Sequence, residues 1–308
     1  MQPILRDNGL SELVAGDLET IASGFEFTEG PLELADGSIL FQDIKSERTH
    51  CFQPDGTTTT LREQTHAANG QTFDRSGRIV FCEQNGRRVS RMNPNGSNVE
   101  TVVELYDGKR VNSPNDIICR SDGTILFTDP PYGVTPELKE LAYQAVFAFG
   151  VDGRLTPLVV DFEKPNGLAL SPDESTLYVC DTAKYHVRAF DLVTANDGTP
   201  KLENDRVFAT MDPGRPGGPD GMKVDREGRV YVAVALGIWV YDPSGIPLGI
   251  LSIPQRPSNL AWSGADAKTL IVTAVDHVHR VKLDIAGIKP PFQTNLSIPH
   301  APANPDAN

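Results

Sequence analysis

The chain has 308 residues, with 28 Lys and Arg against 41 Asp and Glu, so its formal net charge is −13. This acidic balance excludes the basic face that binding to nucleic acid requires. No apolar run approaches the roughly 18 residues of a membrane-spanning helix, so neither nucleic acid nor a membrane is expected as a partner.

The cysteines and the first residues indicate the compartment. None of the four cysteines stands in a Cys-x-x-Cys pair, which excludes zinc-ribbon and thioredoxin-type sites. Cys82 and Cys180 lie in apolar runs, as expected of buried thiols in a reducing environment. The N-terminal MQPILRDNGL has no basic segment followed by an apolar one, so no secretory signal is predicted and a cytoplasmic location is expected.

Short runs of β-type composition follow one another along the chain, each introduced by a turn signal such as Asp36-Gly37. In chain order these runs cover residues 38–43, 78–83, 124–129, 176–181, 229–234 and 269–274. Helical periodicity is scarce. One segment, residues 136–148, has a composition that fits either a short helix or a surface loop.

The turn signals form a repeat. Their second residues, which we call turn markers, are Gly37, Gly77, Gly123, Glu174, Gly228 and Ala267, so successive markers lie 39 to 54 residues apart. Periods of about 40–50 residues with several strands each are typical of β-propellers. We therefore predict one all-β domain, a six-bladed β-propeller over residues 1–289, followed by a Pro-rich, disordered tail over 290–308. Residues 13–25 are expected to close the ring by adding a strand beside residues 278–284.

An oxygen-bearing side chain stands eight residues before every turn marker, although an inserted residue leaves the fourth marker ambiguous by one position. We call these six residues the axial ring: Glu29, Asn69, Asn115, Asn166, Asp220 and Asn259. Equivalent positions of a propeller point in equivalent directions, so at the start of the innermost strands all six would converge on the axis.

Carboxylates and amides that share a small space repel one another unless a cation neutralises them. Hard oxygen ligands suit Ca²⁺ or Mg²⁺ rather than zinc, and the axial ring contains no His or Cys. A central metal-binding channel is therefore predicted. The alternative is that the Asn-Gly and Asp-Gly pairs are turn residues with no shared task, which explains the Asn and Gly residues well but Glu29 poorly.

Several longer motifs contain these positions. They are EGP at 29–31, NGQTFDRSGRIVFCE at 69–83, GRRVSR at 86–91, NSPNDI at 112–117, TDPPYG at 128–133, KPNGLALSPDESTLYVCDT at 164–182 and GGPDGMKVDREGRVYVA at 217–233. Together they resemble the SMP-30/gluconolactonase/luciferin-regenerating family, most closely its gluconolactonase-like branch. The resemblance implies a six-bladed propeller with a divalent cation, usually calcium, in the channel. It also implies hydrolysis of lactones, with relatives that hydrolyse organophosphates.

The resemblance also implies roles for single residues. Glu29, Asn166 and Asp220 match metal ligands of the family, and Asn115 matches a position that ligates the metal or contacts substrate. Asp116 matches an acidic residue to which some members assign proton transfer.

The expected reaction is hydrolysis of a sugar-acid lactone such as gluconolactone to the aldonic acid. Ca²⁺, with Mg²⁺, Mn²⁺ or Zn²⁺ as substitutes, would polarise the lactone carbonyl. Asp220 would act as general base, or as a nucleophile that attacks directly, and Asp116 as acid to the leaving alkoxide. Substrate contacts are expected from Asn69, Asn115, His66 and Tyr132.

Two alternatives stay open. The same metal site could hydrolyse aryl esters or organophosphates, or the chain could be a non-catalytic propeller that binds a ligand or protein on one face. Association with further copies of the chain is also left open. His277 and His279 are expected to be surface or packed residues, and Glu83, Arg87 and Arg88 to form a polar network.

Overall fold

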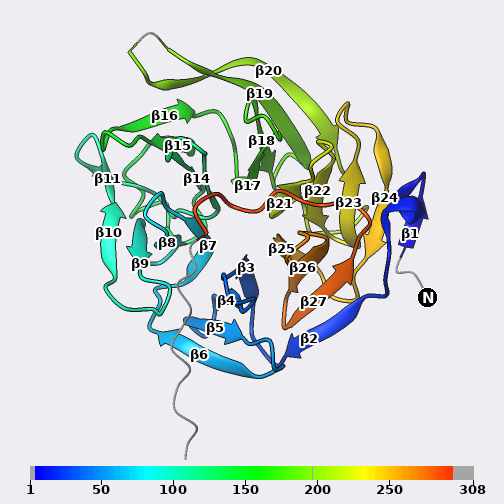
Figure 1. Cartoon of the computed structure of the whole chain (residues 1–308). Coiled ribbons are helices and arrows are strands. Elements are labelled where there is room, and N and C mark those ends of the chain that lie inside the picture. Colours follow the sequence, from blue (N-terminus) through cyan, green and yellow to red (C-terminus); the bar gives the residue numbers. More distant parts are fainter. Residues whose placement is uncertain (1–3, 196, 294–308) are drawn as a thin grey trace, which may run out of the picture.

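The computed structural model describes residues 4–195 and 197–293. Within them, six antiparallel sheets stand as blades around a central axis (Figure 1), which confirms the predicted all-β six-bladed propeller. The one helical segment in these ranges is the short 3₁₀ helix η1 (Leu10–Leu13). No helix in the described part of the chain has the length and apolar composition needed to cross a membrane.

The first three blades follow one another in sequence. Blade 1 consists of β3 (Thr28–Glu33), β4 (Ile39–Asp43), β5 (Arg48–Phe52) and β6 (Thr58–Glu63). Blade 2 consists of β7 (Ala68–Phe73), β8 (Ile79–Glu83), β9 (Arg88–Met92) and β10 (Glu100–Val103). A small ribbon of β11 (Leu105–Tyr106) and β12 (Lys109–Arg110) precedes blade 3. Blade 3 consists of β13 (Ile117–Cys119), β14 (Ile125–Asp129), β15 (Ala145–Phe149) and β16 (Leu155–Val159).

The other three blades complete the ring. Blade 4 consists of β17 (Pro165–Leu170), β18 (Thr176–Asp181), β19 (His186–Thr194) and β20 (Pro200–Thr210). Blade 5 consists of β21 (Met222–Val224), β22 (Val230–Val234), β23 (Gly237–Tyr241), β24 (Pro247–Ser252) and β1 (Ile4–Asp7). Blade 6 consists of β25 (Pro257–Ser263), β26 (Thr269–Ala274), β27 (His277–Lys282) and β2 (Glu19–Ser23).

The N-terminal segment closes the ring as predicted. Strand β2 lies antiparallel to β27, with Glu19 opposite Arg280 and Ser23 opposite His277 (Figure 1). Strand β1, which was not predicted from the sequence, extends blade 5 beside β24. Pairing of the first strands with the last blades ties the two ends of the ring together and covers edges that would otherwise be open.

All six turn markers adopt the left-handed backbone conformation, including the two that are not glycine, Glu174 (φ 58°) and Ala267 (φ 54°). The amide of Glu174 donates to the carbonyl of Ser171, as the amide of Gly77 donates to that of Asp74. The marker in blade 4 is therefore Glu174, and the inserted residue is Ser175, which follows it.

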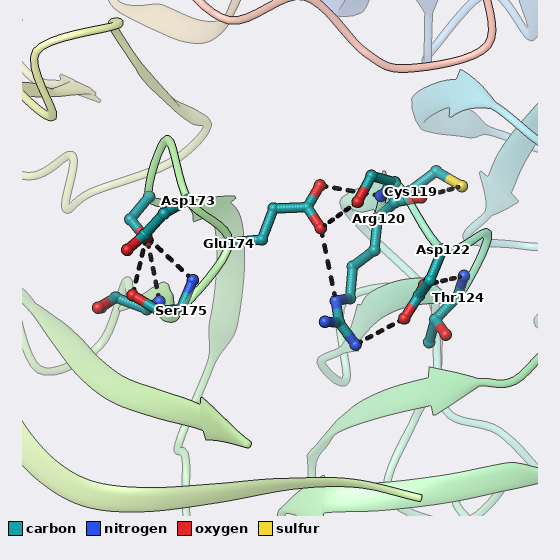
Figure 2. Close-up of polar contacts among 10 residues, drawn as sticks. Cys119, Arg120, Asp122, Thr124, Asp173, Glu174 and Ser175 are labelled. Carbon is teal, nitrogen blue, oxygen red and sulfur yellow. Dashed lines mark hydrogen bonds and ion pairs between the residues drawn. The ribbon is translucent and has the colours of Figure 1, made fainter. Parts of the chain in front are cut away.

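Glu174 offsets the cost of its left-handed conformation by linking two blades. Its carboxylate accepts hydrogen bonds from the amide and hydroxyl of Ser121 in blade 3, at 2.9 and 2.8 Å. Figure 2 shows the side chain reaching across to the neighbouring turn, where Arg120 Nε lies 3.8 Å from a Glu174 oxygen.

The segment 136–148 contains no helix. It runs as a loop up to residue 144 and then enters β15. Alternate residues of β15 face opposite sides of the blade: Ala145 and Phe147 pack toward blade 2, whereas Val146 and Ala148 pack toward blade 4. This period of two favours a strand that is buried on both faces.

The inner strands define two ends of the channel. We call the end at which β3, β7, β13, β17, β21 and β25 begin the upper face. The opposite end contains the turn markers, and there residues 284–293, the strap, cross the middle of the ring (red in Figure 1). The backbone amide of Arg226 donates to the carbonyl of Ala286 at 3.0 Å. Gly287 lies so close to the Trp262 ring that a Cβ at this position would stand 1.8 Å from it.

The first residues of the predicted C-terminal tail belong to the strap. Residues 290–293 are described and lie on the propeller: Phe292 packs beside blades 1 to 3, and Gln293 donates to the carbonyl of Glu33 at 2.9 Å. Residues 294–308, where the rest of the expected tail falls, lie outside the described residues. A cavity of about 110 Å³ lies between the strap and the inner strands, with Lys223 among its lining residues.

Candidate metal centre and active site

The six residues of the axial ring lie where the innermost strands begin. Glu29, Asn69 and Asn166 are the second residues of β3, β7 and β17, and Asn115 and Asp220 stand two residues before β13 and β21. All are between 3% and 5% exposed except Asp220, which keeps a larger part of its surface accessible.

Close backbone contacts join neighbouring positions of the axial ring. A Cβ on Gly30 would lie 2.2 Å from the carbonyl oxygen of Asn69, and one on Gly167 would lie 2.2 Å from that of Asp220. A Cβ on Gly221 would meet the Asn259 side chain at the same distance. The glycines that follow the ring residues are therefore needed for close approach of the blades, a role that the turn interpretation does not provide.

Buried aspartates at the end of the second strand hold three of these segments in place. Asp43 accepts from the amides of Glu26 and Phe27, at 3.1 and 2.8 Å, just before Glu29. Asp129 accepts in the same way from residues 112 and 113, and Asp181 from residues 163 and 164. In each blade the capped segment ends two residues before a residue of the axial ring.

These three aspartates are not among the site residues predicted from the sequence. A signal was present, because the β-type runs at 38–43, 124–129 and 176–181 all end in Asp. Burial raises the pKa of Asp129 to about 7, although the two amide hydrogen bonds oppose this shift.

Glu29 is the most enclosed carboxylate of the axial ring. Its Oε2 accepts hydrogen bonds from the amide of Gly30 at 2.8 Å and from Nδ2 of Asn259 at 2.9 Å. Burial raises the pKa of Glu29 well above its ordinary value, and the nearby charges of Asp220 and Asp116 raise it further. A positive charge nearby would favour the ionised form of this carboxyl.

Asp220 and Asp116 belong to the same electrostatic cluster. Burial raises the pKa of Asp220 to about 7, while Arg256 and a hydrogen bond from Asn166 act in the opposite direction. Burial also raises the pKa of Asp116, against the charge of Lys223. Oδ1 of Asp116 accepts from the amide of Ile117, but Oδ2 is buried and has no hydrogen-bond partner within the described residues.

Asn166 is oriented by two hydroxyl groups. Its Nδ2 donates to Oγ1 of Thr182 at 3.1 Å and to the phenol oxygen of Tyr132 at 3.4 Å. The hydroxyl of Thr182 in turn donates to the carbonyl of Pro219 at 2.7 Å. With its amino group so engaged, Asn166 keeps its amide oxygen available for a cation. Tyr132 thus contacts the axial ring and is itself 41% exposed.

The remaining predicted residues differ in placement. Asn69 and Asn115 are buried in the axial ring. His66 is exposed in the loop between β6 and β7, and no side-chain contact joins it to the axial ring within the described residues. His277 and His279 stack on each other in β27 with ring centres 5.6 Å apart, in agreement with packed residues.

Of the three residues predicted to form a polar network, Arg88 pairs with Glu83 at 2.7 Å, whereas Arg87 makes its contacts elsewhere. Its guanidinium donates to the carbonyls of Val111, Asn112 and Leu138 at 3.0 to 3.2 Å. The bond to Leu138 anchors the long loop between β14 and β15, which contains Tyr132, and the other two anchor the segment that leads to Asn115.

The donor set fits a hard divalent cation. Two ring carboxylates and the ring amides offer the oxygen ligands that Ca²⁺ prefers, and the buried Asp116 lies beside them. No group of three or more His, Cys, Asp or Glu suited to hold a metal is found in residues 4–195 and 197–293, so amide oxygens would have to complete the set. The partnerless Oδ2 of Asp116 and the raised pKa of Glu29 both favour a positive charge at this point.

Comparison with known proteins places the chain in a family. Residues 27–276 match the model of the SMP-30/gluconolactonase/LRE-like region. The chain is 33% identical over 297 residues to the gluconolactonase of Zymomonas mobilis, covering 89% of this chain and 83% of the relative. It is 28% identical over 258 residues to the pentonolactonase XacC of Haloferax volcanii, covering 80% of each protein.

Similarity to solved structures supports the same family assignment. The structure of a gluconolactonase from Xanthomonas campestris superposes with a TM-score of 0.83 at 33% identity, covering 92% of this chain and 95% of that one. A luciferin-regenerating enzyme superposes with a TM-score of 0.76 at 20% identity, which shows the shared fold. The chain therefore belongs to the SMP-30/gluconolactonase/LRE-like family.

Proposed function

We propose that this protein is a divalent-metal-dependent lactonase, with Ca²⁺ as the cation, that opens sugar-acid lactones such as gluconolactone to the aldonic acid. The observation that carries the proposal is that Glu29 and Asp116, both buried, and the partly exposed Asp220 belong to one electrostatic cluster at the axis, and that burial raises the pKa of each. Relatives at 33% and 28% identity that are named as lactonases support the reaction class.

Four residues would hold the cation: Glu29, Asn115, Asn166 and Asp220. When bound, the cation would neutralise the carboxylates and act as a Lewis acid toward a carbonyl oxygen. Asn259 holds Glu29 through the hydrogen bond at Oε2, and Thr182 and Tyr132 hold Asn166. These contacts fix the ligands before substrate arrives, which lowers the reorganisation cost of the reaction.

Asp220 is the general base in this proposal. It is the most accessible carboxylate of the cluster, so water and substrate can reach it, whereas Glu29 is enclosed. Its carboxylate would accept the proton of the attacking water. Oδ2 of Asp116, which is buried and unpartnered, would hold a proton and deliver it to the leaving alkoxide.

Residues of the upper face would position the substrate. The exposed ring of Tyr132 and the exposed side chain of His66 would border the bound lactone, while Asn69 and Asn115 would contact it from within the axial ring. The buried unpartnered Asp116 oxygen also disfavours a non-catalytic propeller, since such a scaffold would retain the desolvation cost without benefit.

The test is elemental analysis of the untagged protein, followed by gluconolactone hydrolysis with and without a chelator. We expect one bound divalent cation per chain and hydrolysis that the chelator abolishes and added Ca²⁺ restores. Absence of a bound metal together with chelator-insensitive hydrolysis, or no hydrolysis of any lactone, would contradict the proposal.

A further inference from the structure

Cationic side chains border the candidate metal centre from two sides, and each rests on an aromatic ring. The guanidinium of Arg256 lies 5.5 Å from the centre of the Phe27 ring, and Nζ of Lys45 lies 5.8 Å from the same centre. Nζ of Lys164 lies 5.9 Å from the centre of the Tyr132 ring. Rings hold such cations in place without neutralising them.

These residues are tied to the axial ring by the chain itself. Phe27 stands two residues before Glu29, and Lys164 two residues before Asn166. Arg256 stands three residues before Asn259, whose side chain donates to Glu29 at 2.9 Å. The pair on Phe27 therefore occupies the seam of blades 6 and 1, while Lys164 occupies the seam of blades 3 and 4 on the opposite side of the axis (Figure 1).

The three cations have no carboxylate partner within ion-pair distance among the residues that the structure describes. Arg188, by contrast, lies between Asp161 and Asp205 and pairs with both.

Most of the acidic residues on the same loops are occupied by other partners. Asp43 and Asp181 accept backbone amides, as described above. Glu163 pairs with Lys184 at 2.6 Å, and Asp276 pairs with His277 at 2.7 Å. Glu26, exposed beside Phe27, is the exception, and it makes no ion pair with Arg256 or Lys45 within the described residues.

Arg256 is the cation most closely connected to the reactive centre. A Cβ on Gly217 would lie 3.2 Å from Cδ of Arg256, so the side chain runs along the loop that leads to Asp220. Arg256 is also exposed, so an incoming ligand can reach it.

We propose that the substrate carries an anionic group, a carboxylate or a phosphate, in addition to its lactone ring, and that Arg256 is the specificity-determining residue that receives this group. Lys45 assists from the same aromatic ring, and Lys164 adds positive potential from the opposite side. An anionic group bound near Arg256 and Lys45 would compensate both positive charges. The planar guanidinium can also bind a carboxylate or phosphate through two parallel hydrogen bonds. This inference rests on the proposed lactonase function and specifies its substrate class.

The test compares kcat/KM for three lactones: neutral glucono-1,5-lactone, 6-phosphoglucono-1,5-lactone and glucaro-1,4-lactone, which carries a free carboxylate. At low ionic strength we expect one of the anionic lactones to be preferred over the neutral one by about tenfold or more, equivalent to one well-formed charged contact. Which anionic lactone is preferred distinguishes phosphate from carboxylate recognition. Added salt should reduce the preference.

Arg256→Gln should lower the ratio of anionic to neutral kcat/KM about tenfold, and Lys45→Gln should lower it less. The matched control is Arg6→Gln, because Arg6 also lies over a ring, that of Trp239 at 5.9 Å, but in blade 5 beside β24, away from the axis. Arg6→Gln should leave the ratio unchanged.

Equal kcat/KM for neutral and anionic lactones, or an equal loss of both in Arg256→Gln, would overturn this inference while metal-dependent hydrolysis of gluconolactone would leave the proposed function intact. If no lactone is hydrolysed, the proposed function fails, and calorimetric binding of 6-phosphogluconate and glucarate decides the inference alone. Binding that Arg256→Gln weakens about tenfold would support it, and binding of neither anion would overturn it.

Discussion

The two ends of the channel are built from the same six repeats but differ in how their charges are satisfied. On the strap side, Glu33 accepts from Ser263 and Gly264 and pairs with Lys289. On the upper side, Asp116 keeps a buried oxygen without a partner, and Arg256 has no carboxylate beside it among the described residues. Glu33 is thus satisfied by the protein itself, whereas we propose that a cation and an anionic substrate group satisfy the charged residues of the upper end.

This difference indicates that residues important for stability and residues important for function lie at opposite ends of the channel. The strap and the turns beneath it tie blades together through contacts that are already satisfied. The upper face retains uncompensated charge, which costs stability unless a ligand is present. Substitutions at the two ends should therefore have different consequences, and the following predictions are arranged from the largest expected effect to the smallest.

Asp220→Asn should lower kcat for lactone hydrolysis by about a thousandfold, because it removes the proposed general base. Folding should be retained, since the blades are held by their own packing. Steady-state kinetics and a thermal melt measure the two properties. Asp122→Asn, in a turn on the strap side, is the control and should keep full activity. An Asp220→Asn variant within tenfold of the parent would show that another group is the base.

Two glycine substitutions should separate the ends of the channel. Gly167→Ala places a Cβ 2.2 Å from the Asp220 carbonyl, and Gly287→Ala places one 1.8 Å from the Trp262 ring. Both should lower the free energy of unfolding by about 1–3 kcal/mol through overpacking. Gly167→Ala should also weaken cation binding at least tenfold, whereas folded Gly287→Ala should bind the cation normally. Urea denaturation and calcium titration distinguish the two; equal loss of binding in both would refute the separation.

Removal of the cation should create a dependence of stability on pH. Without a cation, burial raises the pKa of Glu29, and that of Asp220 to about 7, so the folded chain binds protons more tightly than the unfolded chain. The contribution of these two carboxyls to stability is therefore fully present below their unfolded pKa of about 4 and is lost as pH rises toward 7. We expect Tm of the chelated protein to fall by on the order of 5 °C over this range.

The calcium-loaded protein should lose much less over the same range, because the cation stabilises the ionised carboxylates. Asp129, whose pKa burial also raises to about 7, contributes a similar slope with and without the cation, so the difference between the two melting curves is the informative quantity. Parallel curves would indicate that the axial carboxylates do not face a cation.

Lys289→Ala should have the smallest effect. It removes the partner of Glu33, which is 7% exposed, and should lower the free energy of unfolding by about 1 kcal/mol. Lactone kinetics should not change, since the contact lies on the strap side. A change in KM would show that the strap communicates with the upper face.

The blades and the axial ring could be predicted from the sequence because each blade of a propeller repeats the same geometry. The constant separation of eight residues identified all six members of the axial ring, including Asn166 beside its ambiguous turn marker, and the N-terminal closing strand was also predicted. Resemblance to a family added the expected roles of Glu29 and Asp220, which periodicity alone could not supply.

The remainder depends on contacts that no local pattern encodes. The hydrogen bond between Tyr132 and Asn166 joins two blades, and the pairing of Arg256 with Phe27 joins the last blade to the first. The strap, whose Pro-rich sequence suggested a tail from residue 290, is held over the channel by Trp262 and Glu33. These contacts exist only after the ring has closed.

Calorimetric titration of Ca²⁺ into the chelated protein tests the central claim most directly. The wild-type chain and Glu174→Gln, which alters only the link between blades 3 and 4 on the strap side, should each bind one ion per chain. Glu29→Gln should bind it at least a hundredfold more weakly, because the most enclosed ligand carboxylate is lost. Equal binding by the wild type and Glu29→Gln, or no binding by the wild type, would contradict the assignment of the axial ring as a metal centre.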